Sequence, residues 1–168
     1  MTNLVGCLDP IKGVYAPMMA SEPLPLTDQE WKSIYQRVPR LCVELIIRSD
    51  AGVLLTLRDI EPCKGLWHIP GGTVRYAEPL VGAIRRTAQH ELGIISTGAE
   101  LLGYIEYPSH YLHGLDCPVG IAFDVAFEGE VRLNNEAKQW AWFKELPEFM
   151  HDDQGEFLVS HQLVSSRS

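Results

Sequence analysis

The stretch that decides the fold runs from Gly72 to Ile94 and reads GTVRYAEPLVGAIRRTAQHELGI. Its apolar residues recur every four positions, which is the stripe of a helix lying on a core: Leu80, Ile84, Ala88 and Leu92. Pro79 suits the first turn of that helix, where a missing N–H is not needed, and Gly93 suits the left-handed residue after its last turn. The stretch therefore predicts a loop that leads into a short helix.

A polar face follows from the same periodicity. Thr87, His90 and Glu91 lie three or four positions apart, so they share one side of the helix, next to the apolar stripe. A polar face in that place is directed toward a cleft. Gly71 and Gly72 let the backbone pass close to a ligand, so their carbonyl groups can coordinate a cation. We therefore expect a cation site where the glycines meet this helix.

The spacing resembles the signature of the Nudix hydrolases, G-x5-E-x7-R-E-U-x-E-E-x-G-U, in which U is aliphatic. Thr87 and His90 stand where the family has glutamate. The resemblance implies an α/β/α sandwich with a mixed central β-sheet, the motif helix on one face and further helical segments on the other. It also implies a Mg²⁺-dependent hydrolase, with Mn²⁺ as an alternative ion, for a nucleoside diphosphate linked to another group. The signature positions that match are Gly72, Glu78, Arg86, Glu91 and Gly93.

The resemblance also implies roles for single residues. Glu91, Glu136 and a carbonyl of Gly71 would hold the metal, and Glu91 is the ligand that remains within the signature. Glu78 and Arg86 would pair and hold the loop against the helix. The alternative for Glu91 is a solvated glutamate in the last turn of a helix, and the alternative for the pair is two unrelated surface charges.

Two positions change the expected chemistry. The hydroxyl of Thr87 is neither basic nor anionic, so we expect one metal ion instead of a cluster of two or three. His90 can coordinate a metal, activate water or donate a hydrogen bond to phosphate. A histidine satisfied by a backbone carbonyl is the competing interpretation of His90.

The chain is similar over a longer span to one branch of the family, the GDP-mannose mannosyl hydrolases, which also keep only the last glutamate of the signature. That branch has a helix before a step such as Val38-Pro39, an acidic residue in the first strand, here Glu44, and an arginine at the position of Arg58. The resemblance implies that Glu44 and Arg58 contact the nucleotide sugar and its diphosphate, for which the guanidinium fork of Arg58 is suited. The alternatives are an outward strand residue and an exposed strand-end charge.

The branch also has residues that this chain lacks. Ala137 stands where the branch has a histidine base, and Thr73 stands where it has an arginine after the two glycines. His110 or His113 is a candidate for the base, with a polar loop residue as the alternative, and Arg75 is a candidate for the arginine. The substrate and the bond that is cleaved stay open. The competing hypothesis is a Nudix fold that binds a nucleotide as a sensor without catalysis.

The composition of the chain limits the classes of molecule that it is expected to bind. The formal net charge of -8 argues against a nucleic-acid surface, whereas a nucleotide can still be held by a metal ion and a few arginines. The four cysteines follow no CxxC pattern, and neither a signal peptide nor an apolar run long enough to span a membrane is present. We therefore expect reduced thiols, a cytoplasmic location, a small-molecule substrate and no membrane partner.

Length and local patterns predict the domain and its elements. We expect a proline-containing extended arm over residues 1–26, whose apolar content favours subunit exchange in a homodimer, and one domain over residues 27–168. Thr27 and Glu30 form a capping box that begins a helix reaching about Arg37, with Trp31, Ile34 and Tyr35 on its buried side. A polar covering loop over residues 108–118 and a helical final segment after residue 145 complete the pattern. The predicted strands are residues 41–47, 53–57, 67–69, 101–107, 119–127 and 140–143.

Overall fold

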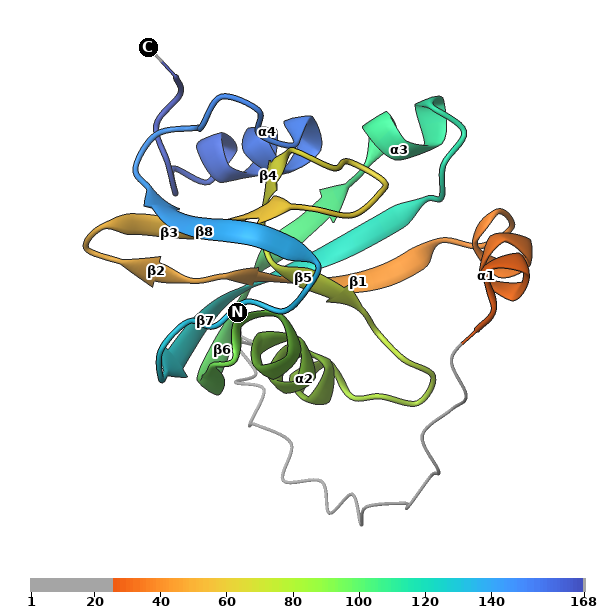
Figure 1. The fold of residues 1–168 in the computed structure, drawn as a ribbon, viewed down its shortest axis with the longest axis horizontal. Coiled ribbons are helices and arrows are strands. Elements are labelled where there is room, and N and C mark those ends of the chain that lie inside the picture. The colour runs from red at the N-terminus through yellow and green to blue at the C-terminus, as the bar shows by residue number, and fades with distance from the viewer. Residues whose placement is uncertain (1–25, 168) are drawn as a thin grey trace, which may run out of the picture.

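A computed structural model describes residues 26–167, so almost all of the arm expected over residues 1–26 lies outside the described residues. The described chain has three layers (Figure 1). Helix α2 (Leu80–Leu92) covers one face of the central strands, and α3 (Pro108–Leu112) and α4 (Asp152–Ser160) lie on the other face. The predicted α/β/α sandwich is confirmed. No helix in this part of the chain is long and apolar enough to cross a membrane.

The first sheet has the strand order β5-β1-β7-β6. Strand β1 (Arg40–Ile46) runs parallel to β7 (Pro118–Glu128) and antiparallel to β5 (Gly71–Thr73), and β6 (Ile95–Glu106) is antiparallel to β7. The sheet is therefore mixed, as predicted. The glycines expected in a loop instead form β5, because their backbone pairs with β1.

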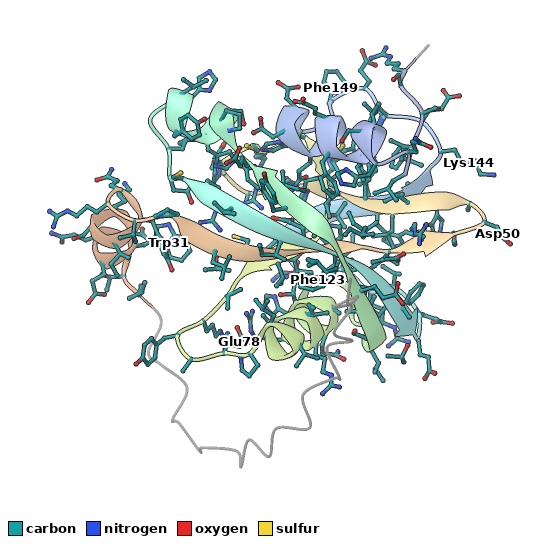
Figure 2. The ribbon with its side chains drawn as sticks, turned by 180° about the vertical axis from the view of Figure 1, so that it is seen from behind. Trp31, Asp50, Glu78, Phe123, Lys144 and Phe149 are labelled. Carbon is teal, nitrogen blue, oxygen red and sulfur yellow. The ribbon has the colours of Figure 1, made fainter. Side chains whose placement is uncertain are left out.

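The second sheet is antiparallel and centred on β3 (Gly52–Arg58). One side of β3 pairs with β2 (Arg48–Ser49) and β4 (Trp67–His68), and the other side pairs with β8 (Ala137–Phe143). Figure 2 labels Asp50 at the tip of the hairpin between β2 and β3. The predicted hairpin and closing strand are present.

Strand β1 is buried on both faces and separates the two parts of the core. Val43 and Leu45 pack with Ile84 of α2, whereas Ile46 belongs to the cluster that contains Leu158 of α4. A strand covered on both faces has a nearly continuous apolar sequence, which is how residues 41–47 read. Because side chains alternate along a strand, Glu44 is directed to the same face as Ile46 and away from α2.

Helix α1 (Asp28–Tyr35) begins with the predicted capping box, since the Thr27 N–H donates to Glu30 Oε2 at 2.8 Å and the Glu30 N–H donates to Thr27 Oγ1 at 3.3 Å. The prediction of a buried side was wrong, because no residue of α1 is buried and the Trp31 and Ile34 side chains are 37% and 40% exposed. Figure 2 shows Trp31 at one end of the molecule, where α1 projects beyond the sheet. Helical periodicity alone does not supply the surface against which a helix packs.

Two segments differ from the prediction. Strand β6 begins at Ile95, well before the predicted residue 101, and the covering loop over residues 108–118 contains α3. The early part of β6 is mostly exposed, so it lacks the apolar alternation by which a strand is recognised. The final segment is helical as predicted, because it forms α4.

The segment between β5 and α2 is held by a bidentate ion pair. Arg86 donates to both carboxylate oxygens of Glu78, at 2.7 and 2.8 Å, and to the carbonyl oxygen of Thr73 at 2.9 Å. The Arg75 N–H also donates to Glu78 Oε2, at 2.9 Å. Figure 2 shows Glu78 in the loop beside α2, which ends at Gly93 in the left-handed conformation with φ 65°. These bonds fix the position of β5 relative to the helix.

Replacing the arginine should loosen this loop. Arg86→Ala removes two charge-assisted bonds to Glu78 and leaves the Thr73 carbonyl without its guanidinium donor, so we expect the free energy of unfolding in urea to fall by about 2 kcal/mol. Arg85→Ala, at the exposed neighbouring position, is the matched control and should change it by less than about 0.5 kcal/mol. Equal losses in the two variants would contradict this role of the ion pair.

Candidate functional site

A cleft of about 990 Å³ opens where the two sheets meet α1 and α2. Its lining combines strand ends with side chains from all helices of the described chain, so it brings together residues that are far apart in the sequence. The volume is at the upper end of the range found for small-molecule sites. A ligand as large as a nucleotide can therefore be accommodated.

Nine of the thirteen residues singled out in the sequence line this cleft, and four do not. Those in the lining are Glu44, Arg58, Gly71, Gly72, Arg86, His90, Glu91, His110 and Glu136. Those outside it are Arg75, Glu78, Gly93 and His113. For Glu78 and Gly93 this agrees with a structural role, because one pairs with Arg86 and the other ends α2.

The structure does not bring Arg75 or His113 to the cleft. Arg75 is exposed in the loop after β5. His113 is exposed at the residue that ends α3, and its Nδ1 lies 2.6 Å from the carbonyl oxygen of Ser109. Neither residue lines the cleft, so these positions give no support to the expectations that Arg75 binds the diphosphate and that His113 acts as the base.

Glu91 lies in the last turn of α2 and faces the preceding strand. Its Oε2 accepts a hydrogen bond from the Gly71 N–H at 3.3 Å. Burial raises the pKa of Glu91 to about 8, and the negative charges of Glu136 and Glu44 add to this effect. Three carboxylates thus influence one another inside the cleft, which is an arrangement that favours a bound cation.

The residue next to Glu91 and the loop opposite it complete this end of the cleft. His90 is exposed, and its Nδ1 lies 3.3 Å from Nδ2 of Asn134. The Asn134 side chain also accepts a hydrogen bond from the Glu136 N–H at 2.9 Å. Asn134 therefore connects the end of α2 with the loop that carries Glu136.

Gly72 lies directly against α2. A Cβ atom at this position would lie 2.7 Å from Oγ1 of Thr87, which is closer than real Cβ contacts come. Thr87 is buried, and its hydroxyl oxygen has no hydrogen-bond partner in the described protein. The glycine therefore permits the close approach that brings the backbone of β5 to the helix.

Glu44 is a buried carboxyl at the inner wall of the cleft. The Tyr107 hydroxyl donates to its Oε1 at 2.7 Å, and Gln154 Nε2 donates to the Tyr107 oxygen at 2.9 Å. Burial raises the pKa of Glu44 to about 7, although the hydrogen bond from Tyr107 and the charge of Arg40 oppose the shift. A Cβ at Gly71, the cross-strand partner of Glu44, would lie 2.2 Å from Glu44 Oε2. The carboxyl therefore occupies space that only glycine leaves open.

Arg58 contributes positive charge to the same cleft. It lies at the end of β3, and its Nε donates to the carbonyl oxygen of Pro62 at 2.6 Å. Burial lowers the pKa of His68 to about 3, and the charge of Arg58 lowers it further. His68 is therefore neutral at physiological pH, so it adds no positive charge that would repel Arg58.

Sequence reasoning missed several residues that line the cleft. Tyr107 and Gln154 hold Glu44, yet they are 63 and 110 positions from it and form no motif with it. Another part of the cleft wall contains Cys63, His151 and the partner of His110, Asp116. His110 Nδ1 lies 3.0 Å from Asp116 Oδ1. No spacing in the sequence connects these residues, because β6, α3 and α4 bring them together only in the folded chain.

The family model of the NUDIX domain matches residues 38–159, which cover the signature and most of the cleft. The chain belongs to the Nudix family. It is 35% identical over 131 residues to the low-salt glycan biosynthesis protein Agl8 of Haloferax volcanii, covering 75% of this chain and 84% of that protein. It is 31% identical over 116 residues to an ADP-ribose pyrophosphatase of Methanocaldococcus jannaschii, covering 68% of each protein.

The fold agrees with this assignment. A MutT Nudix hydrolase of Burkholderia pseudomallei superimposes with a TM-score of 0.66 at 28% identity, covering 76% of this chain and 99% of that one. This chain is therefore a Nudix hydrolase, from a family of enzymes that act on nucleoside diphosphate derivatives and generally use divalent metals.

The buried carboxyl of this Nudix hydrolase should make its stability depend on pH. Because the folded pKa of Glu44, about 7, lies above the unfolded value of 4.5, the folded state holds the proton more tightly. The stability contributed by this group is present below pH 4.5 and is lost as the pH rises to about 7. Relative to Glu44→Gln, the wild type should lose on the order of 2–3 kcal/mol over that range.

The measurement is urea unfolding of both proteins at a series of pH values. Glu106→Gln removes an exposed carboxylate of β6 and is the matched control, whose difference from the wild type should not vary in this way. A difference between wild type and Glu44→Gln that stays constant from pH 5 to about pH 8 would refute the burial of an ionisable carboxyl here.

Proposed function

We propose that this Nudix hydrolase cleaves a nucleoside diphosphate linked to a sugar, and that it does so with Mg²⁺ or, alternatively, Mn²⁺. The two relatives support this substrate class from different directions. One is named for glycan biosynthesis, and the other for hydrolysis of ADP-ribose, which is itself a nucleoside diphosphate joined to a sugar. Sugar nucleotides are the class of compound that fits both names.

The carboxylate group around Glu91 carries the proposal. Carboxylate and carbonyl oxygens are the ligands that Mg²⁺ prefers, and Glu91, Glu136 and the Gly71 carbonyl are of this kind. Burial, followed by the charges of Glu136 and Glu44, raises the pKa of Glu91, and a cation between the carboxylates would offset the repulsive part of this effect. The neutral Thr87 hydroxyl beside them supports a single ion. When bound, the ion supplies charge neutralisation at the diphosphate oxygens.

Other residues of the cleft bind the substrate in this proposal. Arg58 lines the cleft and contacts the diphosphate through its guanidinium group, whose fork of donors suits phosphate oxygens. Glu44 accepts hydrogen bonds from hydroxyl groups of the sugar. Trp31 and Tyr35 of α1 line the cleft and offer aromatic faces to the base.

The protonation of His110 decides which histidine we assign as the catalytic base. The carboxylate of Asp116, followed by the Cys63 thiol, raises the pKa of His110 to about 9, so His110 is protonated at neutral pH and is a poor proton acceptor. His90 adjoins the metal ligand Glu91 in sequence and lines the cleft. We therefore assign His90 to activation of water and withdraw His110 from that role.

The domain organisation, oligomeric state, location and partners of the enzyme are part of the proposal. Residues 27–168 act as one domain, and the preceding arm exchanges between the subunits of a homodimer. The enzyme works in the cytoplasm on a small-molecule nucleotide and binds neither nucleic acid nor membrane, in keeping with its formal charge of -8.

Glu91→Gln tests the metal ligand. The amide keeps the shape of the side chain but loses the negative charge, so hydrolysis of sugar nucleotides in Mg²⁺ should fall on the order of 100-fold or more. A panel of ADP-, GDP- and UDP-sugars is incubated with each protein and the products are separated by chromatography. Glu100→Gln, an exposed carboxylate on β6, is the control and should retain activity.

Two outcomes would overturn the proposal. One is full Mg²⁺-dependent turnover by Glu91→Gln, which would remove this carboxylate from the site. The other is binding of sugar nucleotides without turnover by the wild type in either Mg²⁺ or Mn²⁺, measured by calorimetry, which would favour the sensor hypothesis. Turnover in ¹⁸O-labelled water then distinguishes attack at phosphorus from attack at the anomeric carbon, since the label enters phosphate or sugar respectively.

A further inference from the structure

A cluster of soft ligand atoms lies in the wall of the cleft. Cys63, His110 and His151 each offer one ligand atom, and these three atoms all lie within 4.8 Å of one another. The proposed hydrolysis uses none of the three residues. All three line the cleft, and both histidines are more than nine-tenths buried, at 7% and 5% exposure.

Two of the three distances between the ligand atoms are close to those of tetrahedral coordination. Two imidazole nitrogens bound to one zinc ion at about 2.0–2.1 Å lie roughly 3.3–3.4 Å apart, and a thiolate bound at about 2.3 Å lies about 3.6 Å from each nitrogen. Here His110 Nε2 lies 3.2 Å from His151 Nε2 and 3.8 Å from the Cys63 sulfur. An ion between these atoms therefore needs only small side-chain adjustments.

The surroundings of His110 are those of a metal-bound histidine. Its other nitrogen, Nδ1, lies 3.0 Å from Asp116 Oδ1, and Asp116 is itself paired with Arg40. Histidines that bind metals commonly donate their second N–H to a carboxylate, which fixes the ring orientation and the tautomer. Asp116 and Arg40 thus hold the imidazole with Nε2 directed at the other two ligands.

Cys63 and His151 support the same interpretation. Cys63 has a positive φ of 66°, a conformation that few residues other than glycine adopt, and this places its thiol beside the two rings. Hydrogen bonds from His110 and His151 lower the pKa of the thiol to about 6, and binding of a metal would release the protons that the thiol and His110 Nε2 carry without it, because only the deprotonated groups coordinate. His151 Nε2, the nitrogen that faces His110, is the ligand atom of this ring, whereas its Nδ1 is buried and has no hydrogen-bond partner in the described protein.

We propose that Cys63, His110 and His151 bind a thiophilic divalent cation of the Zn²⁺ type, with a fourth coordination position open to the cleft. One thiolate and two imidazoles form a donor set that selects such an ion over Mg²⁺, which prefers oxygen. The site is therefore distinct in chemistry from the carboxylate group around Glu91. Its fourth position accepts water or an oxygen of a molecule bound in the cleft.

A nucleophilic triad is the competing arrangement, since Cys63, His110 and Asp116 resemble a nucleophile, a base and an orienting carboxylate. His151 decides against it. A second imidazole nitrogen 3.2 Å from the base has no function in a triad, whereas it supplies the third ligand of a metal site.

The test uses the full chain, freed of metal with a chelator and titrated with Co²⁺, a spectroscopic substitute for Zn²⁺. We expect one equivalent to bind with the visible absorption of a tetrahedral ion and a sulfur-to-metal charge-transfer band, and Zn²⁺ to displace it. Cys63→Ser should abolish that band, and Cys117→Ser, the matched control at another partly buried thiol, should retain it. Asp116→Asn should weaken binding about 10–100-fold.

The proposal is wrong if Co²⁺ does not bind, or if the charge-transfer band persists in Cys63→Ser. A measurement on the wild type covers the case in which a variant fails to fold: Zn²⁺ should protect Cys63 from iodoacetamide, mapped by peptide mass spectrometry, and unchanged labelling would overturn the proposal. Glu91→Gln should bind Co²⁺ normally, so failure of the proposed hydrolysis is distinguishable from failure of this site.

Discussion

The contact between β5 and α2 is the constraint on which the site depends. Gly72 lies against Thr87 at a distance that no side chain tolerates, and this closeness lets the Gly71 N–H reach the carboxylate of Glu91. The pair of Arg86 and Glu78 then fixes the intervening loop. Because β5 is also paired with β1, the same contact sets the position of Glu44 relative to Glu91. A local backbone approach thus determines the geometry of the carboxylates.

The electrostatics of the cleft explain how an acidic protein can accept an anionic substrate. Burial raises the pKa of Glu44 to about 7 and that of Glu91 to about 8, and the charges of Glu136 and Glu44 add to the effect on Glu91. Arg58 and Arg40 oppose this effect with positive charge. A site poised in this way changes its charge readily when a cation and a diphosphate bind, since protons and metal ions compete for the same oxygens. Charges on the protein surface have little influence on these buried groups, because salt screens exposed charges over distances longer than about 10 Å.

The cleft contains two donor sets of different chemistry. Carboxylate oxygens gather at the end of α2, whereas sulfur and imidazole nitrogen gather where α3 and the start of α4 meet the loop before β4. Glu44 lies within the influence of both, because the charge of His110 lowers its pKa and its own charge raises that of Glu91. A change in protonation or metal binding at one end is therefore felt electrostatically at the other.

The sequence by itself determined the features that depend on near neighbours. The helix over Leu80–Leu92, its glycine end and the capping box at Thr27 follow from periodicity and local hydrogen bonding, and the spacing of Glu78, Arg86 and Glu91 indicated the family. Most of the residues singled out line the cleft because they are carried by those elements or by the strands beside them. Local patterns suffice where the partners are only a few positions apart.

Only the tertiary structure decided which distant groups meet. Helix α1 has an apolar side but none of its residues is buried, and Arg75 and His113 are exposed residues that do not line the cleft. Cys63, His110 and His151 are separated by 47 and 41 positions, so no spacing predicted their convergence. Such contacts arise when strands and helices pack, and the energy that brings them together comes mainly from burying the core around β1, not from the polar residues themselves.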